Sequence, residues 1–263
     1  MPRRFLITVF LASTCAIAGE ATQKLLTTLS HRTDGAEVLE LEVGSDDPER
    51  RFVTPEERAV LEKNRKEVVR AELEKLKTKC DLGAAMVLGE LGEKSALPQL
   101  ERCFLDDTYT YGWETDEPNP LDAMQHPHHY AFEEGISAVT GKKLEEVISL
   151  DDKATQKLLA RKDDAARYVL YRLNPKALTA KVAAEFKRAA PGSSHRFTLA
   201  LQLSYLVSRL PRAEMTNLLG PADVEEAARF LYRVQNVHEE QVNFVIEFDE
   251  AGLVRRAAVE RPE

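Results

Sequence analysis

The chain has 263 residues, of which 43% are hydrophobic and 30% are charged, and its formal net charge is −8. This apolar content suffices for the core of one large domain or two small ones. The excess of carboxylates opposes the binding of a polyanion, so we expect no nucleic-acid partner.

The first 18 residues have the pattern of a secretory signal peptide. Arg3 and Arg4 form a basic start, an apolar stretch runs from Phe5 to Ala18, and Ala16-Ile17-Ala18 is a small-x-small cleavage site. The apolar stretch is shorter than the roughly 20 residues that a membrane-spanning helix needs. We therefore expect an exported protein, periplasmic or secreted, whose mature chain starts near Gly19.

Two alternatives remain for this segment. One is a buried N-terminal helix, although two arginines directly before an uncapped apolar run fit a buried helix poorly. The other is a degenerate lipobox at Ala12-Ser13-Thr14-Cys15, in which a lipid on Cys15 anchors the protein to a membrane. Ala12 and Thr14 are unusual residues at the first and third positions of that motif.

Residues 19–53 form an N-terminal extension ahead of the helical part. Apolar and polar residues alternate over 36–43, which predicts one strand that ends at Gly44. Thr54, Pro55 and Glu57 then form a capping box with proline at the first helical position. The helix that they open is expected to reach about Thr78. Its charged face is interpreted as solvated, because the apolar spacing does not hold heptads long enough for a coiled coil.

The segment from Leu82 to Leu105 predicts two short amphipathic helices joined at Leu91-Gly92-Glu93-Lys94. Apolar residues recur at helical spacing on both sides of this joint, and Gly89 permits the close approach of another helix. A single helical hairpin cannot bury its apolar face alone, so we expect neighbouring hairpins to stack on it.

Three later segments, near 128–150, 163–188 and 193–210, have a similar helical pattern. The four starts, near residues 81, 127, 163 and 194, lie about 46, 36 and 31 residues apart. Residues 80–210 therefore resemble a HEAT-type helical repeat protein, a class that holds partners and seldom catalyses reactions. The resemblance implies a mainly α fold, a HEAT-like α-solenoid of helical hairpins, with residues 54–210 as its repeat domain. A non-repetitive helical bundle is the alternative.

Beyond Leu210 the apolar periodicity changes, which predicts a small α+β module at 211–263. The module is expected to contain a helix and an antiparallel meander, with Gly252 at positive φ in a hairpin loop. The expected elements are a helix at Pro211–Leu219 and strands at Arg229–Val234, Val242–Phe248 and Leu253–Val259.

Three features of this tail resemble the small module of the SmpA/OmlA outer-membrane lipoproteins and of β-lactamase-inhibitor-like proteins. They are Leu219-Gly220-Pro221, Tyr232 and Phe248-Asp249-Glu250-Ala251-Gly252. Those families are exported binding modules, and the resemblance implies such a role for residues 210–259. The usual glycine before the first helix is absent here, and a plain helix-plus-meander cap on the solenoid is the alternative.

The longest interruption of the helical pattern, residues 106–129, is the predicted functional surface. It contains Tyr109, Tyr111 and Trp113 among carboxylates and prolines. Rigid aromatic rings with adaptable polar neighbours suit the recognition of a protein partner. The alternative interpretation is that these rings fill a gap between two repeats.

His126, His128 and His129 lie near carboxylates of the same segment, and such a combination can bind zinc. However, adjacent residues such as His128 and His129 point about 100° apart on a helix. A metal site would require the loop carboxylates Asp116, Glu117 and Asp122 to fold back. We therefore expect no bound metal, and interpret the histidines as polar residues of the surface and the start of a helix.

The sequence contains no catalytic motif of the Gly-x-Ser-x-Gly, glycine-rich phosphate-loop or His-Glu-x-x-His type. We therefore expect a non-catalytic scaffold or adaptor, without a cofactor, that binds another protein in the cell envelope. The alternative is an exported metal-dependent hydrolase with its site in the 106–129 loop.

Cys80 and Cys103 are the two cysteines that remain after the expected cleavage. In an oxidising compartment such a pair favours a disulfide. The two ends of the 82–105 hairpin that carry them are neighbours if its helices are antiparallel, which suits the Cα separation of a bridge. Two buried free thiols are the alternative.

Overall fold

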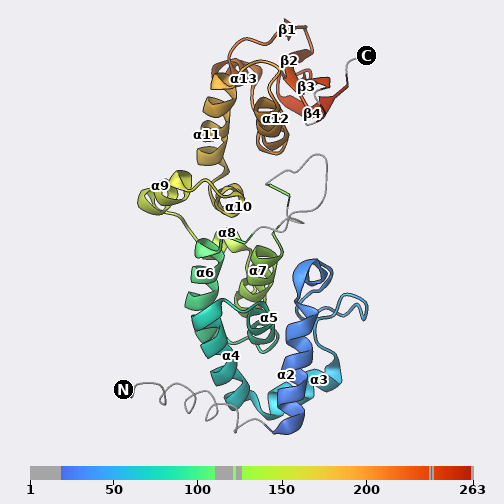
Figure 1. Ribbon diagram of the computed structural model, residues 1–263, viewed down its shortest axis with the longest axis vertical. Coiled ribbons are helices and arrows are strands. Elements are labelled where there is room, and N and C mark those ends of the chain that lie inside the picture. Colours follow the sequence, from blue (N-terminus) through green and yellow to red (C-terminus); the bar gives the residue numbers. More distant parts are fainter. Residues whose placement is uncertain (1–18, 110–120, 123–125, 237, 239, 262–263) are drawn as a thin grey trace, which may run out of the picture. The chain divides into compact units, whose positions relative to one another are not determined.

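A computed structural model describes residues 19–109, 121–122, 126–236, 238 and 240–261 (Figure 1). The expected signal peptide, Cys15, Tyr111 and Trp113 lie outside the described residues. The described chain is mainly helical, with a four-stranded antiparallel sheet near its C-terminal end. None of its helices is long and apolar enough to cross a membrane.

The chain divides into two compact units. The first contains the described residues up to Tyr109 together with His126–Ser149, and the second contains Leu121, Asp122 and the residues from Leu150 onward. The division at Ser149 and Leu150 falls inside the stretch 54–210 that the sequence groups as one repeat domain. Continuous stacking of hairpins over 80–210 therefore stays a prediction.

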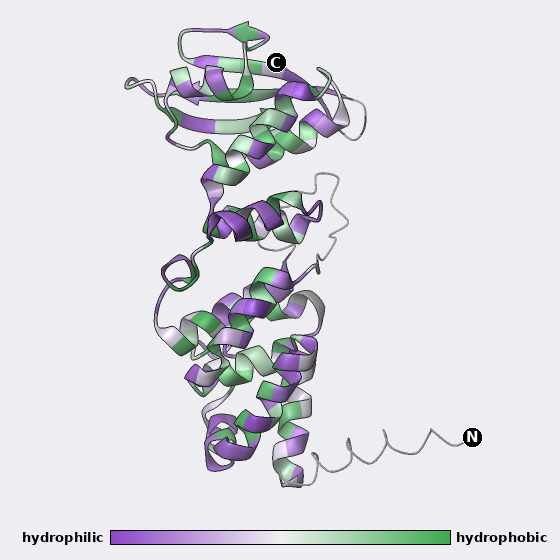
Figure 2. Ribbon diagram, turned by 90° about the vertical axis from the view of Figure 1, so that its left-hand side faces the viewer, coloured by the Kyte–Doolittle hydropathy of each residue, from purple (hydrophilic) through white to green (hydrophobic). Residues whose placement is uncertain are grey.

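The first unit is a cluster of short helices. α5 packs against α7, α4 and α2, and α6 packs against α7 and α4. Apolar and polar residues are interspersed along the helices, as amphipathic elements require (Figure 2). Its helices are α2 (Glu20–Arg32), the 3₁₀ helix η1 (Gly35–Glu40), α3 (Pro55–Lys63), α4 (Arg65–Lys79), α5 (Leu82–Glu90), the 3₁₀ helix η2 (Lys94–Ala96), α6 (Leu97–Asp106), α7 (Pro127–Thr140) and α8 (Leu144–Val147).

The strand expected at 36–43 is wrong. The 3₁₀ helix η1 covers most of it, and only an isolated bridge joins Glu42 to Arg51. Val38 is fully buried in a cluster that includes Leu29 and Phe52, so burial of one apolar side chain replaces the pairing that a strand needs.

The helix expected from Thr54 to about Thr78 is two helices, α3 and α4, which meet at Asn64. The capping box of Thr54 and Glu57 is present as predicted. At the break, the side-chain amide of Asn64 donates to the Val60 carbonyl oxygen at 3.0 Å and to the Thr22 hydroxyl at 2.9 Å. These contacts reward a turn away from helical geometry at Asn64.

Two glycines allow α5 and α7 to touch. A Cβ added to Gly89 would lie 3.1 Å from the Cα of Gly135, and a Cβ added to Gly135 would lie 3.0 Å from the Ala85 carbonyl oxygen. The close approach that the sequence predicts at Gly89 is therefore present, and its partner is α7.

A disulfide joins Cys80, which follows α4, to Cys103 on α6, and the two Cα atoms are 5.5 Å apart. Cys80 ends α4 in the left-handed region, with φ of 50°. The bridge therefore ties α4 to α6 across the intervening helix α5.

The second unit combines five helices of the described chain with the sheet. The expected meander and the positive φ of Gly252 are present. The strand order is β1-β2-β3-β4, and every neighbouring pair is antiparallel. The elements are α9 (Asp152–Ala160), α10 (Asp164–Leu173), α11 (Pro175–Arg188), α12 (Ser194–Leu206), α13 (Arg212–Leu219), β1 (Val224–Glu225), β2 (Arg229–Gln235), β3 (Gln241–Phe248) and β4 (Val254–Glu260).

Helices α11 and α12 belong to the core of this unit. The ring of Phe186 on α11 meets Tyr232 at 5.6 Å and Phe244 at 5.9 Å between centroids. α12 packs against β2 and β4. The sheet therefore shares its core with two helices that lie before residue 211, the expected start of the small module.

Candidate functional site

The end of α6 and the start of α7 bring together an aspartate, a tyrosine and three histidines. Asp107 Oδ2 lies 3.2 Å from Nδ1 of His128 and 3.9 Å from Nδ1 of His129. The rings of His126 and His129 meet edge to face at 5.6 Å between centroids. All these residues belong to the first unit.

Tyr109 gives this group an exposed aromatic face. Its ring stacks on the ring of His128, with centroids 3.9 Å apart and planes 7° from parallel. Tyr109 remains 37% exposed, and the side chain of His128 is 28% exposed. The pair forms a two-ring surface, whose orientation Asp107 fixes from behind through His128.

The other two histidines are interior residues. His126 and His129 are fully buried, and His129 packs edge to face on Phe104 with 5.1 Å between centroids. The expectation that all three histidines are polar surface residues is therefore wrong for these two. α6 supplies an aromatic wall that their sequence neighbourhood does not reveal.

Asp107 is held in its ionised form. Burial alone raises the pKa of its carboxyl, but the hydrogen bond from His128 and the nearby charges of His128 and His129 outweigh that effect, so the pKa lies below its usual value. An ionised Asp107 is the state that orients His128 most firmly.

The candidate residues from the sequence are placed unequally. The structure brings His126, His128 and His129 together with Tyr109, while Tyr111, Trp113, Asp116 and Glu117 lie outside the described residues. Within the described part of the chain, no group of three or more His, Cys, Asp or Glu residues is arranged to hold a metal ion.

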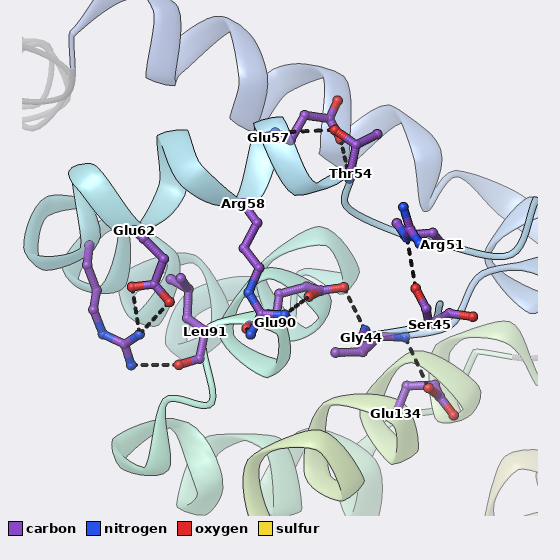
Figure 3. Close-up of polar contacts among 12 residues, drawn as sticks. Gly44, Ser45, Arg51, Thr54, Glu57, Arg58, Glu62, Glu90, Leu91 and Glu134 are labelled. Atoms are coloured by element: carbon purple, nitrogen blue, oxygen red, sulfur yellow. Dashed lines mark hydrogen bonds and ion pairs between the residues drawn. The ribbon is translucent and has the colours of Figure 1, made fainter. Parts of the chain in front are cut away.

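A second polar group surrounds the loop between η1 and α3, and no pattern in the sequence announces it. Glu90 on α5 accepts the backbone N–H of Gly44 at 2.8 Å, and Glu134 on α7 accepts that of Val43 at 3.3 Å (Figure 3). The hydroxyl of Tyr130 donates to the Leu41 carbonyl oxygen at 2.8 Å. Two helices thus hold three consecutive parts of one loop.

Both carboxylates of this loop clasp are inside the protein. Burial is the main cause that raises the pKa of Glu90, and the Gly44 N–H and the charges of Arg58 and Arg51 oppose it only in part. Burial also raises the pKa of Glu134, with a further contribution from the charge of Glu42. The clasp carries two acids whose ionisation costs free energy in the folded state.

The residues that carry the SmpA/OmlA-like resemblance have structural contacts. The hydroxyl of Tyr232 donates to the Gly220 carbonyl oxygen at 3.1 Å, and Gly220 has φ of +80°. Asp249 Oδ1 accepts the backbone N–H groups of Ala251 at 3.0 Å and Leu253 at 2.9 Å. These contacts explain the residue types from folding alone.

Comparison of the chain with protein-family models, with curated proteins and with solved structures finds no match. The resemblances to HEAT repeats and to the SmpA/OmlA-like module therefore remain predictions from the sequence.

Proposed function

We propose that this protein is an exported, non-catalytic adaptor that binds another protein of the cell envelope through the surface around Tyr109 and His128. The observation that carries this proposal is the stacked, partly exposed ring pair that Asp107 orients. Exposed rings that neighbouring residues already hold in place lose little conformational entropy when a partner covers them.

The location of the pair supports the same function. Tyr109 and His128 flank the acidic, aromatic segment 110–125, which joins α6 to α7. A partner that covers the ring pair therefore also meets Tyr111 or Trp113 without a change of binding surface. Tyrosine and tryptophan are enriched among the residues that dominate binding energy at interfaces.

The proposal includes a HEAT-like scaffold. Its support is the helix-turn-helix formed by α5, η2 and α6, followed by α7 packed against both helices. Stacked helices of this kind present a ligand surface on the loops and helix ends that join them.

Export is the remaining part of the proposal. The arginine-led apolar start and the Ala16-Ile17-Ala18 site support it, and so does the Cys80–Cys103 bridge, because disulfides persist in oxidising compartments. The implied location is the periplasm or the medium, or the membrane surface if Cys15 carries a lipid.

The test is affinity capture from envelope extract with a matched pair of tyrosine variants. Tyr109→Ala should reduce the recovery of a specific partner at least about tenfold, the loss of an interface residue worth more than 1.4 kcal/mol. Tyr205→Ala removes a tyrosine that is 49% exposed in the second unit and should leave recovery unchanged.

Both variants should melt within a degree or two of the natural protein, since each truncates an exposed ring. Equal recovery of the partner by Tyr109→Ala and the natural protein would remove the ring pair from the binding surface. A large fall in melting temperature for Tyr109→Ala would make the ring a structural residue.

A further inference from the structure

The last strand of the sheet has an open edge. β4 is hydrogen-bonded to β3 on one side, and on the other side only its first residue is bonded, where Val254 exchanges bonds of 2.9 and 3.1 Å with Leu210 and Arg209. In the described part of the chain, no strand pairs with the outer side of β4 after that point. Such an edge presents unpaired backbone N–H and C=O groups.

The register of the sheet assigns the side chains of β4 to its two faces. Ala257 and Val259 are level with Ile246 and Phe244, so they share the face on which the ring of Phe186 lies. Arg256, Ala258 and Glu260 alternate with them and therefore lie on the opposite face.

The charges on that opposite face are self-complementary. Arg256 and Glu260 are equally far from Ala258, on either side of it along the strand. If a second copy of β4 runs antiparallel beside the first with Ala258 opposite Ala258, each Arg256 lies opposite a Glu260. The small side chain of Ala258 leaves room at the centre, and no like charges are directly opposed.

This register also keeps the faces aligned. Ala257 of one copy lies opposite Val259 of the other, so the apolar side chains of both copies stay on the helix-covered face. A shift of one residue would instead place Arg256 opposite Val259, from the other face. Register is therefore determined by both charge and burial.

We propose that two copies of this protein pair edge to edge along β4, antiparallel about a two-fold axis through Ala258. The two four-stranded sheets then form one continuous antiparallel sheet of eight strands. The interface is isologous, as in most homodimers, because the same strand supplies both sides.

Charged residues on an edge strand usually oppose such pairing, and Arg256 already contacts Glu260 at 2.5 Å and Glu247 at 3.8 Å within its own chain. An edge with charges of one sign repels its copy, whereas this edge offers each copy an opposite charge. One strand pair buries less than the roughly 1,200–2,000 Å² of a stable complex. The dimer should therefore dissociate on dilution.

The first experiment is analytical ultracentrifugation of the full chain with charge variants. The natural protein should show a dimer fraction that rises with concentration. Arg256→Glu and Glu260→Arg should each be monomeric, because like charges then face each other, and the double variant R256E/E260R should dimerise again. A monomeric natural protein at every concentration, or dimerisation of both single variants at the natural level, would overturn the proposal.

The second experiment tests the register. The variant A258C should form a disulfide-linked dimer whose bridging peptides both contain position 258, because directly opposed residues place Cβ atoms about 4.5–5.5 Å apart. The control is A251C, in the exposed loop between β3 and β4, which should not cross-link. Equal cross-linking of both variants would indicate random collisions and contradict the register.

Discussion

Glu90 and Glu134 hold the loop before α3 at the cost of burying two acids. Each carboxylate satisfies one backbone N–H of the loop, and the partner charge nearest to Glu90 is Arg58, at 3.6 Å. A buried carboxylate that receives one hydrogen bond and one distant ion pair remains poorly solvated. The clasp should therefore be strongest at a pH where these acids are protonated.

The first prediction concerns the pH dependence of stability. Because the folded-state pKa of Glu90 lies above its ordinary value of 4.5, the stability present below pH 4.5 is lost as the pH rises through the folded-state pKa. Glu90→Gln keeps an oxygen for the Gly44 N–H but cannot ionise. Relative to the natural protein, the variant should be more stable at pH 8 than at pH 5.

Urea denaturation at these two pH values measures the difference. Asp107 and Glu57 have lowered pKa values, so their contributions are lost only as the pH falls below their ordinary range, outside this window. Glu134→Gln should change stability in the same direction as Glu90→Gln. A stability difference that is equal at pH 5 and pH 8 for both variants would contradict the account of the clasp.

The second prediction concerns the contact between α5 and α7. Gly135→Ala places a Cβ 3.0 Å from the Ala85 carbonyl oxygen and 3.3 Å from a methyl group of Leu100. Overpacking of this kind costs about 1–3 kcal/mol, which should exceed the roughly 1 kcal/mol that alanine gains over glycine in a helix. The unfolding free energy from chemical denaturation should therefore decrease, and an increase would show that the helices separate freely.

At the level of elements, the sequence predicts what depends on nearby residues. Thr54 and Glu57 are three residues apart, and their capping box forms as expected. The break at Asn64 depends on Thr22, which is 42 residues away in the sequence, so no local pattern reveals it. The expected strand at 36–43 fails for a related reason, since alternation predicts a strand only if a partner strand is available.

The candidate site divides along the same line. The sequence identifies the segment of Tyr109 and the three histidines from composition. It does not predict that His126 and His129 are buried, because Phe104 on α6 makes the environment of His129. The carboxylates of the loop clasp are missed altogether, because glutamates on a helix usually indicate a solvated face.

The third prediction concerns the disulfide between α4 and α6. Free-thiol labelling of the denatured, unreduced mature protein should modify neither Cys80 nor Cys103. A bridge that closes a loop over a sequence separation of 23 residues contributes on the order of 3 kcal/mol in the chain-entropy model. The double variant C80S/C103S should lose about that much stability, and labelling of two cysteines per chain would show that no bridge forms.

At the level of the whole molecule, the sequence misplaces the helices that complete the sheet. α11 and α12 have the same helical periodicity as the earlier segments, so the sequence groups them with the repeats. The contacts of Phe186 with Tyr232 and Phe244 show that they share a core with β2 and β3 instead. Periodicity describes one element, whereas packing depends on which other element covers its apolar face.

The fourth prediction tests this division. A fragment of residues 150–263 should fold with a cooperative thermal transition, because it contains every described helix that packs on the sheet. A fragment of residues 211–263 lacks α11 and α12 and should be unfolded, since the rings of Tyr232 and Phe244 lose their cover. Circular dichroism distinguishes the two, and cooperative folding of the shorter fragment would contradict the shared core.

Site-specific photo-crosslinking tests the central claim, partner binding around Tyr109, most directly. A photoreactive phenylalanine analogue replaces Tyr109 in one strain and Tyr205, the matched exposed tyrosine of the second unit, in another. Irradiation of intact cells should join position 109 to one specific envelope protein and leave position 205 without that adduct. Absence of a protein adduct at position 109, or the same adduct at both positions, would contradict the proposed binding surface.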